Sequence, residues 1–309
     1  MQQYPLVTIV GGSGFIGRHT VKHFAKAGWR VRVLVRDTVK AEFIKMAGYP
    51  GQVVLDHADV ARPETLEGKF AGSTAVVNLV GILYPRGRQK FDAVHVRGAK
   101  AVAAQAAKAG AATLVQLSAI SAGKSEANYA RTKLAGEEAA RAAFPGAVML
   151  RPSLVVGPED GFFQRFARMG SLLPVLPLIR GGKTKFQPVL VTDVASAIFH
   201  AATHAEDAGK IFELAGPEVF SFRELLLQMK AITKRDVALV PLPCPLAGLV
   251  AMGSEIAPFA PVITCDQLRL LKTDAVMGDG AAGFAQLGIS PAAIGSQLPT
   301  YLARYIKQA

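Results

Sequence analysis

The chain has 309 residues, of which 50% are hydrophobic and 19% are charged, so it is long enough to bury one large core or two unequal lobes and too apolar for a disordered protein. Its formal net charge of +12 suits anionic head groups or an acidic protein surface, but the basic residues are scattered, and the densest group, Arg86, Arg88 and Lys90, lacks the interleaved aromatics of a strand-binding groove. We therefore expect no nucleic-acid partner.

The first half of the chain alternates short β-rich runs with helical stretches. Its N-terminus enters a strand without a basic n-region or cleavage site, and no apolar run reaches the ~18 residues of a membrane span, which favours a cytoplasmic protein. Strands without polar alternation, separated by helices, predict a parallel sheet covered on both faces, an α/β Rossmann-type doubly wound fold. The predicted strands are residues 6–10, 30–35, 53–56, 75–80, 113–117, 147–150 and, as the last before a region of different composition, 210–216.

A glycine-rich turn, IVGGSGFIGRHTV, follows the first predicted strand and opens a helix. Gly11 permits the tight turn, Gly14 lets the backbone approach a pyrophosphate, and Gly17 lets the helix pack closely on the strand. Unpaired N–H groups and the helix dipole then favour an anion. The strand–turn–helix context favours a dinucleotide over a purely structural turn. The predicted cofactor contacts are Gly11, Gly12, Ser13, Gly14, Phe15, Ile16 and Gly17.

The second predicted strand ends in VLVRD, with Arg36 where many dinucleotide folds carry an acidic residue for the ribose hydroxyls. A carboxylate would repel a 2′-phosphate, whereas a guanidinium pairs with it in a forked geometry. We therefore expect NADP(H) rather than NAD(H), although Asp37 follows immediately. The alternative is a surface pair between Arg36 and an acid, which would contribute little to stability.

Tyr129 and Lys133 are four residues apart in a predicted helix over residues 128–142, and so lie on one face. An ammonium beside a phenol favours the phenolate, which predicts that the pKa of Tyr129 is lowered from ~10 toward a range useful for proton transfer. The same lysine can hydrogen-bond a nicotinamide ribose. An ordinary helical Tyr/Lys pair is the alternative reading of this spacing.

The glycine turn, LVRD, Asp59-Val60 after the third strand, NLVG after the fourth, and YARTK after LSAIS together resemble the short-chain dehydrogenase/reductase superfamily, in its extended or atypical branch. The resemblance covers about the first 220 residues. It implies that Asp59 and Val60 meet the adenine, and that Tyr129 and Lys133 occupy active-site positions. It further implies that Leu79, Val80 and Gly81 line the cofactor and that Pro152 and Ser153 pass the nicotinamide.

Two positions depart from that family pattern. Ala119 stands where members usually carry the serine that binds the reacting carbonyl or hydroxyl, so Ser118 or Ser121 would have to substitute. His95 stands where many extended members have an asparagine. Stabilisation of a developing oxyanion is therefore in question, and Ser118 is only a candidate catalytic residue.

The C-terminal region is apolar but broken by prolines. Residues 241–271 are interrupted by Glu255 and predict either a buried helical hairpin or a docking face for a partner or membrane surface. Cys244 and Cys265 are too few for a disulfide framework and lack metal-ligand spacing, so we expect packing roles, a reducing compartment and no metal site. We expect a Rossmann domain of residues 5–157 and 187–217, and a smaller, mainly helical, partner-facing lobe of residues 158–186 and 218–309.

Later segments carry a narrower likeness over nearly the whole chain. They are RPSLVVGPEDGFFQRFA, GGKTKFQPVLVTDVASAI, FELAGPEVFSFRELL, TCDQLRLLKTDAV and LGISPAAIGSQLPTYLARY. They resemble the family of NADPH-binding accessory subunits of respiratory complex I, in its alphaproteobacterial form. The resemblance implies a tightly bound NADPH far from the electron-transfer chain and a subunit that stabilises the peripheral arm near the quinone site. Its partners would be other complex I subunits, on the cytoplasmic side of the bacterial inner membrane.

The leading hypothesis is thus a non-catalytic or poorly catalytic NADP(H)-binding subunit of NADH:ubiquinone oxidoreductase, in which Tyr129 and Lys133 hold the cofactor. An independent reductase or epimerase acting on a small carbonyl or nucleotide-sugar substrate is the alternative that the Tyr129–Lys133 pair supports. A regulator that senses redox state through NADP(H) and switches partners is a third reading.

Overall fold

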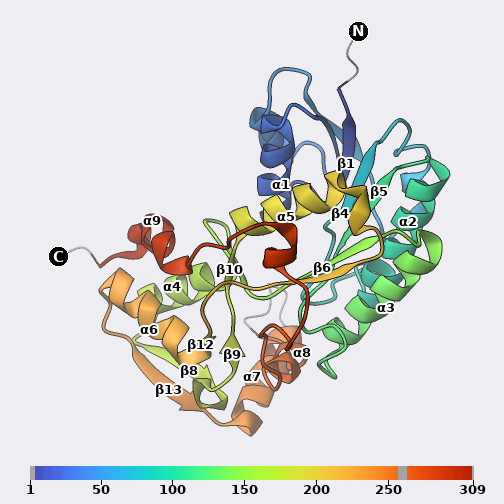
Figure 1. Ribbon diagram of the computed structural model, residues 1–309. Coiled ribbons are helices and arrows are strands. Elements are labelled where there is room, and N and C mark those ends of the chain that lie inside the picture. Colours follow the sequence, from blue (N-terminus) through green and yellow to red (C-terminus); the bar gives the residue numbers. More distant parts are fainter. Residues whose placement is uncertain (1–3, 257–262, 308–309) are drawn as a thin grey trace.

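The structure, a computed structural model, describes residues 4–256 and 263–307 and is built around a seven-stranded parallel sheet (Figure 1). The strand order is β11-β6-β5-β4-β1-β2-β3. The chain runs outward from β1 through β3 and then returns to the other side of β1, so the switch point between β1 and β4 opens a crevice at the carboxyl ends of these strands. The strands are β1 (Leu6–Val10), β2 (Arg30–Val35), β3 (Val53–His57), β4 (Ala75–Asn78), β5 (Thr113–Leu117), β6 (Val148–Pro152) and β11 (Ile211–Leu214).

Helices cover both faces of the sheet, which confirms the predicted doubly wound α/β fold. Helices α1 (Phe15–Lys26) and α5 (Val191–Thr203) lie on one face, and α2 (Gly98–Lys108) and α3 (Asn128–Ala143) on the other (Figure 1). Successive strand side chains point to opposite faces. Ile9 accordingly packs into the core under α1 and α5, while Val10 packs into the core under α2 and α3.

A smaller lobe lies beside the large sheet and consists of helices and short strand pairs (Figure 1). Its apolar core gathers around Phe163, Leu176, Phe222 and Leu298. Its helices are α4 (Phe163–Leu172), α6 (Phe222–Thr233), α7 (Cys244–Ile256), α8 (Cys265–Leu270) and α9 (Leu298–Leu302). Its strands are β8 (Val175–Ile179) with β13 (Ala238–Leu242) and β9 (Lys185–Phe186) with β12 (Phe220–Ser221), while β7 (Val155–Val156) and β10 (Val189–Leu190) form the junction with the large sheet.

Every predicted strand is present, with small differences at the ends. β4 ends at Asn78 rather than at residue 80, because the Asn78 side chain accepts a hydrogen bond from the Val80 N–H (3.2 Å) and the chain turns out of the sheet. β6 extends to Pro152, and β11 is two residues shorter at its end than expected. β11 is the last strand of the large sheet only, since β12 and β13 follow it in the smaller lobe.

The expectation of a buried helical hairpin at residues 241–271 is wrong for α7. This helix buries the small side chains of Ala247 and Ala251 and exposes four larger apolar side chains to solvent. The exposed side chains are Leu246, Leu249, Val250 and Met252, at 49%, 64%, 45% and 55%. Cys265 is half-buried, whereas the Cys244 side chain lies outside what the structure describes. None of the helices in residues 4–256 and 263–307 combines the length and the apolar character that a membrane span requires.

We propose the division of the chain predicted from the sequence, with residues 5–157 and 187–217 forming the nucleotide-binding domain and residues 158–186 and 218–309 the smaller lobe. The separate core around Phe163 and Phe222 supports this division. Val156 and Leu190 pack in that core although they lie in the first part, and Phe284 and Leu287 pack under α1 and α5 although they lie in the second, so the two cores share segments at the boundary.

Candidate functional site

The glycine turn connects β1 to α1 as the sequence predicts. Gly11 has φ +82°, a value that favours glycine, and its N–H donates to the carbonyl oxygen of Leu34 (3.0 Å). A Cβ on Gly17 would lie 2.6 Å from the Cα of Gly12, so only glycine allows α1 to approach the turn this closely. Helix α1 has no side-chain cap and no acidic residue in its first turn. Its N-terminal N–H groups are therefore available to an anion.

Arg36 lies at the carboxyl end of β2, beside a hollow of about 270 Å³. The Asp37 carboxylate accepts a hydrogen bond from the Lys40 N–H (3.0 Å) and pairs with the Lys40 Nζ (3.1 Å). The same backbone hydrogen bond lowers the pKa of Asp37. Over the ranges that the structure covers, Arg36 has no ion pair, so the alternative of a surface pair is not seen. The hollow is lined by Ser13, Val35, Arg36, Asp37, Lys40, Ala41 and Phe43.

The residues predicted to flank the adenine and the middle of the cofactor lie at the carboxyl edge of the sheet. Asp59 follows β3, and its carboxylate accepts hydrogen bonds from the Gln89 Nε2 (3.1 and 3.2 Å) and the Ala61 N–H (3.0 Å). Val60 is 4% exposed. Leu79 and Val80 are half-buried after β4, and Gly81 is exposed. Whether a nucleotide contacts these residues stays a prediction.

Tyr129 and Lys133 lie in the first two turns of α3, which begins at Asn128. The Lys133 Nζ donates to the carbonyl oxygen of Leu117 (2.7 Å), and within the described ranges no hydrogen bond joins the two side chains. Burial raises the pKa of Tyr129 to about 12 and lowers the pKa of Lys133 to about 8, with Glu137 acting in the opposite direction on the lysine. The expectation of a lowered Tyr129 pKa is therefore wrong for this structure, because desolvation dominates. With this pKa the Tyr129 hydroxyl carries its proton at neutral pH and can donate a hydrogen bond.

His95 links the loop after β4 to α3. Its Nε2 accepts a hydrogen bond from the Ile82 N–H (3.0 Å), so the neutral ring carries its proton on Nδ1 and donates to the Thr132 Oγ1 (2.9 Å). Burial, followed by the charge of Lys133, lowers the pKa of His95 to about 3. A Cβ on Gly81 would lie 3.6 Å from the Lys133 Nζ and 3.7 Å from the His95 Nε2. His95 is therefore a neutral support beside the lysine, a role that sequence spacing alone did not reveal.

Ser118 has an unsatisfied hydroxyl. The residue is 5% exposed, and its Oγ has no hydrogen-bond partner in the described ranges. Buried polar groups normally have a partner, so this oxygen is suited to a bound ligand. The neighbouring Ala119 is 8% exposed and brings no donor to the position where the family pattern has a serine. The alternative Ser121 is half-buried, at the start of the loop that precedes α3.

The segment predicted to pass the nicotinamide is held by the C-terminal region. Pro152 is buried, and the Ser153 Oγ donates to the carbonyl oxygen of Ala275 (2.6 Å). The Asp266 carboxylate, on α8, accepts hydrogen bonds from the N–H groups of Asn128 (2.7 Å) and Tyr129 (2.9 Å). Sequence reasoning missed Asp266, because a contact across 138 residues leaves no local signal.

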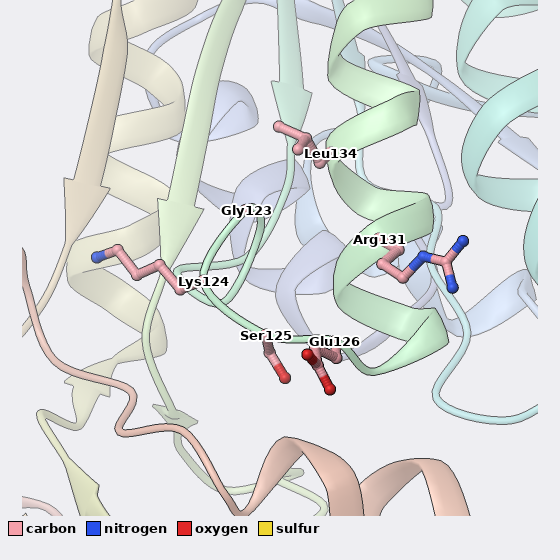
Figure 2. Close-up of a pocket in the computed structure, with 6 residues that line it drawn as sticks. All are labelled: Gly123, Lys124, Ser125, Glu126, Arg131 and Leu134. Carbon is pink, nitrogen blue, oxygen red and sulfur yellow. The ribbon is translucent and has the colours of Figure 1, made fainter.

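A second hollow of about 620 Å³ lies between the loop before α3 and the helix itself (Figure 2). Its two cationic side chains do not converge, since Figure 2 shows Lys124 and Arg131 pointing in opposite directions. Lys124 pairs instead with Glu213 of β11 (2.9 Å). The hollow is therefore not arranged to hold an anion between these cations. It is lined by Gly123, Lys124, Ser125, Glu126, Arg131 and Leu134.

A dinucleotide that runs from the glycine turn toward α3 fits three features of this site. They are the glycine turn itself, the N-terminus of α1 without a side-chain cap, and the Ser118 hydroxyl without a hydrogen-bond partner. Comparison with known proteins agrees with this arrangement. The NAD dependent epimerase/dehydratase family model matches residues 7–215, which span the large sheet and end just after β11.

Of two relatives, one is named as a subunit of an enzyme complex and the other as a reductase. The chain is 32% identical over 314 residues, 98% of this chain and 78% of the relative, to a protein of Arabidopsis thaliana named NADH dehydrogenase [ubiquinone] 1 alpha subcomplex subunit 9, mitochondrial. It is 37% identical over 179 residues to a ceramide reductase of Caulobacter vibrioides, but this match covers only 56% of this chain and 54% of the relative.

Among solved structures, a triphenylmethane reductase of Citrobacter sp. superposes with a TM-score of 0.76 over 96% of this chain and 99% of its own. The two sequences are 19% identical, so the likeness concerns the fold, including the C-terminal lobe, and not the activity.

Proposed function

Because the chain belongs to the NAD dependent epimerase/dehydratase family, we propose that it is an NADP(H)-binding accessory subunit of NADH:ubiquinone oxidoreductase in which the nucleotide has a mainly structural role. The observation that carries the proposal is the share of the chain that the sequence match to a complex I subunit covers. The family model ends at residue 215, whereas the match to the Arabidopsis NADH dehydrogenase subunit covers 98% of the chain and so includes the smaller lobe. The sequence match to the Caulobacter ceramide reductase, in contrast, covers only 56% of the chain.

The geometry supports NADPH as the preferred nucleotide. The turn from Gly11 to Gly17 leaves the N-terminus of α1 open to a pyrophosphate. Arg36 lines the hollow beside Ser13 and forms no ion pair in the part of the chain that the structure describes, so its guanidinium can pair with a 2′-phosphate on the adenosine ribose. The Asp37 carboxylate is paired with Lys40 and is therefore not free to bind a 2′-hydroxyl.

The tyrosine end of the site favours retention of the nucleotide over turnover. Bound NADP(H) supplies a nicotinamide ring capable of hydride transfer, but the protein groups around it are poorly equipped for proton transfer. The pKa of Tyr129 is raised to about 12, and Ala119 provides no hydroxyl beside Ser118. Tyr129, Lys133 and Ser118 are then binding groups. A ligand that binds the folded state stabilises it by mass action, so a retained nucleotide can support the fold without reacting.

We further propose that the partners are other subunits of the complex and that the chain sits peripherally on the cytoplasmic side of the bacterial inner membrane. The exposed apolar side chains of α7, among them Leu249 and Met252, support a partner-facing role for the smaller lobe.

Purification of the native complex tests this function. The protein should comigrate with NADH:quinone reductase activity and carry one NADPH that does not exchange during purification. The Tyr129→Phe variant should leave the activity of the complex nearly unchanged. A protein that is absent from the complex, or a collapse of turnover in this variant, would contradict the proposal.

A second candidate is a stand-alone NADP(H)-dependent reductase acting on a carbonyl compound, which the 37% identity to the Caulobacter ceramide reductase favours. The Tyr129–Lys133 pair and the unsatisfied Ser118 hydroxyl would then be the groups that meet the substrate. The isolated protein would oxidise NADPH in the presence of a carbonyl substrate, and Tyr129→Phe would abolish this activity. Absence of such oxidation by the protein, together with membership of the complex, excludes this candidate.

A further inference from the structure

The helix that carries Tyr129 and Lys133 is capped by a residue from the opposite end of the chain. Asn128 and Tyr129 are the first two residues of α3, and their N–H groups point to the carboxylate of Asp266 at 2.7 and 2.9 Å. One carboxylate oxygen serves each N–H. Asp266 therefore satisfies two backbone donors that have no acceptor inside the helix.

Helix α3 has no cap of its own. The residue before it is Ala127, which cannot accept a hydrogen bond through its side chain, and the first turn contains no acidic residue. A carboxylate at a helix N-terminus also interacts favourably with the helix dipole. Asp266 is 8% exposed, so this interaction is only weakly screened by solvent. The position of the first turn of α3 thus depends on where α8 lies.

Helix α8 belongs to a continuous segment that touches the tyrosine end at three places. We call residues 264–278 the C-terminal strap. A capping box between Thr264 and Gln267 starts α8, and beyond it Ala275 accepts a hydrogen bond from the Ser153 Oγ (2.6 Å). The carbonyl oxygen of Val276 accepts one from Lys124 (3.4 Å). The strap therefore holds α3, the loop before it and the segment after β6.

From this geometry we infer that Asp266 is a positioning residue that couples docking of the C-terminal strap to nucleotide binding at Tyr129 and Lys133. The inference rests on the proposed NADP(H) site. Because two linked equilibria must affect each other equally, NADPH favours the docked strap by the factor by which the docked strap raises NADPH affinity. The smaller lobe thereby reports to its surroundings whether the nucleotide is present.

Amide hydrogen exchange of the full-length protein, with and without NADPH, measures the coupling directly. In the wild type, the amides of Asn128 and Tyr129 should be protected although they lack intrahelical acceptors. NADPH should slow exchange of the strap amides by about 5- to 10-fold. Equal strap exchange with and without bound NADPH would overturn the inference.

The Asp266→Ala variant should bind NADPH about 5- to 10-fold more weakly, as expected for loss of a helix cap that nucleotide binding requires. The Asn128 and Tyr129 amides should exchange rapidly in this variant, and NADPH should no longer protect the strap. The Asp266→Asn variant keeps one acceptor oxygen and loses the charge, so its NADPH affinity should lie between those of the wild type and Asp266→Ala. It replaces the alanine variant if that variant does not fold.

Asp274→Asn is the matched control. Asp274 also lies in the strap, and its carboxylate also accepts a backbone hydrogen bond. The donor is the Lys185 N–H of β9 (2.8 Å), so Asp274 does not contact α3 through this bond. NADPH affinity in this variant should stay within about 2-fold of wild type. An affinity loss as large as that of Asp266→Ala would show a general loosening of the strap and overturn the specific role of Asp266.

The same experiments separate this inference from the proposed function. A chain that binds NADPH with a coupled strap but does not join the oxidoreductase would refute the accessory-subunit proposal and leave the coupling intact. A chain that joins the complex but shows unchanged NADPH affinity after Asp266→Ala and Asp266→Asn would refute the coupling and leave the accessory-subunit proposal intact.

Discussion

The two ends of the proposed nucleotide site are built in different ways. The turn end is made by consecutive residues between β1 and α1, and its shape follows from backbone geometry at Gly11 and Gly17. The tyrosine end is assembled from segments far apart in sequence, with α3 held by His95 on one side and by Asp266 on the other. Disturbance of the turn end should therefore stay local, whereas disturbance of the tyrosine end should change the stability of the fold as well.

The largest effect is expected beneath the tyrosine end. Glu137 on α3 forms two hydrogen bonds with Arg151 of β6 (2.9 and 2.7 Å), and the two side chains are 4% and 15% exposed. Loss of one partner of a buried ion pair leaves the other uncompensated. Glu137→Gln should lower the free energy of unfolding by about 3 kcal/mol, measured by urea denaturation.

The control for this prediction is Asp92→Asn, because the Arg97–Asp92 pair is 69% and 64% exposed. This exposed pair should contribute less than about 1 kcal/mol. Similar losses in the two variants would show that the buried pair does not hold the tyrosine end more firmly than a surface contact.

Gly17→Ala tests the turn end. The added Cβ would lie 2.6 Å from the Cα of Gly12, and backbone cannot move aside as a flexible side chain can. We expect nucleotide binding to weaken about 100-fold, measured by calorimetry. Gly161→Ala is the control, since nothing lies within 4 Å of a Cβ there. Unchanged binding in Gly17→Ala would remove the turn from the site.

Arg36→Ala separates the two nucleotides at the turn end. Loss of a charge-assisted contact with the 2′-phosphate should weaken NADPH binding about 30-fold, while NADH binding changes less than about 3-fold. Calorimetric titration of both nucleotides measures this difference. Equal losses for NADPH and NADH would mean that Arg36 does not recognise a 2′-phosphate.

The smallest effect is a pH dependence at the tyrosine end. Burial lowers the pKa of Lys133 to about 8, while the raised pKa of Tyr129 and the lowered pKa of His95 keep those groups from titrating near that pH. NADPH affinity should therefore fall by up to about 10-fold between roughly pH 7 and pH 9.5, because the lysine loses its positive charge and its hydrogen bond to a ribose hydroxyl becomes a weaker, neutral one. The Lys133→Met variant should bind more weakly with a flat profile, and a flat wild-type profile would exclude this role.

The ligand-free protein should show the opposite trend in stability. The pKa of Lys133 is lower in the folded state than in the unfolded chain, so between about pH 8 and pH 10.5 the unfolded state binds more protons. The contribution of Lys133 to the free energy of unfolding therefore rises with pH in this window and is absent in Lys133→Met. Urea denaturation at a series of pH values measures it.

Local features of this chain could be predicted from its sequence, and long-range ones could not. The seven strands and the glycine turn follow from apolar runs and glycine spacing, which act over a few residues. The direction of the Tyr129 pKa was missed, because it depends on how deeply α3 is buried and not on the neighbouring lysine. Asp266 was missed for the same reason, since its role depends on α8 reaching α3 in three dimensions.

Asp266, which caps α3, is synthesised after all the strands of the large sheet. All seven strands of the large sheet are complete at Leu214, whereas Asp266 emerges from the ribosome later. At about 5–20 residues per second, the intervening segment takes several seconds to synthesise. The sheet of a nascent chain is thus complete before the residue that caps α3 has been made. If the proposed nucleotide binds during synthesis, it meets a tyrosine end whose helix cap is not yet present.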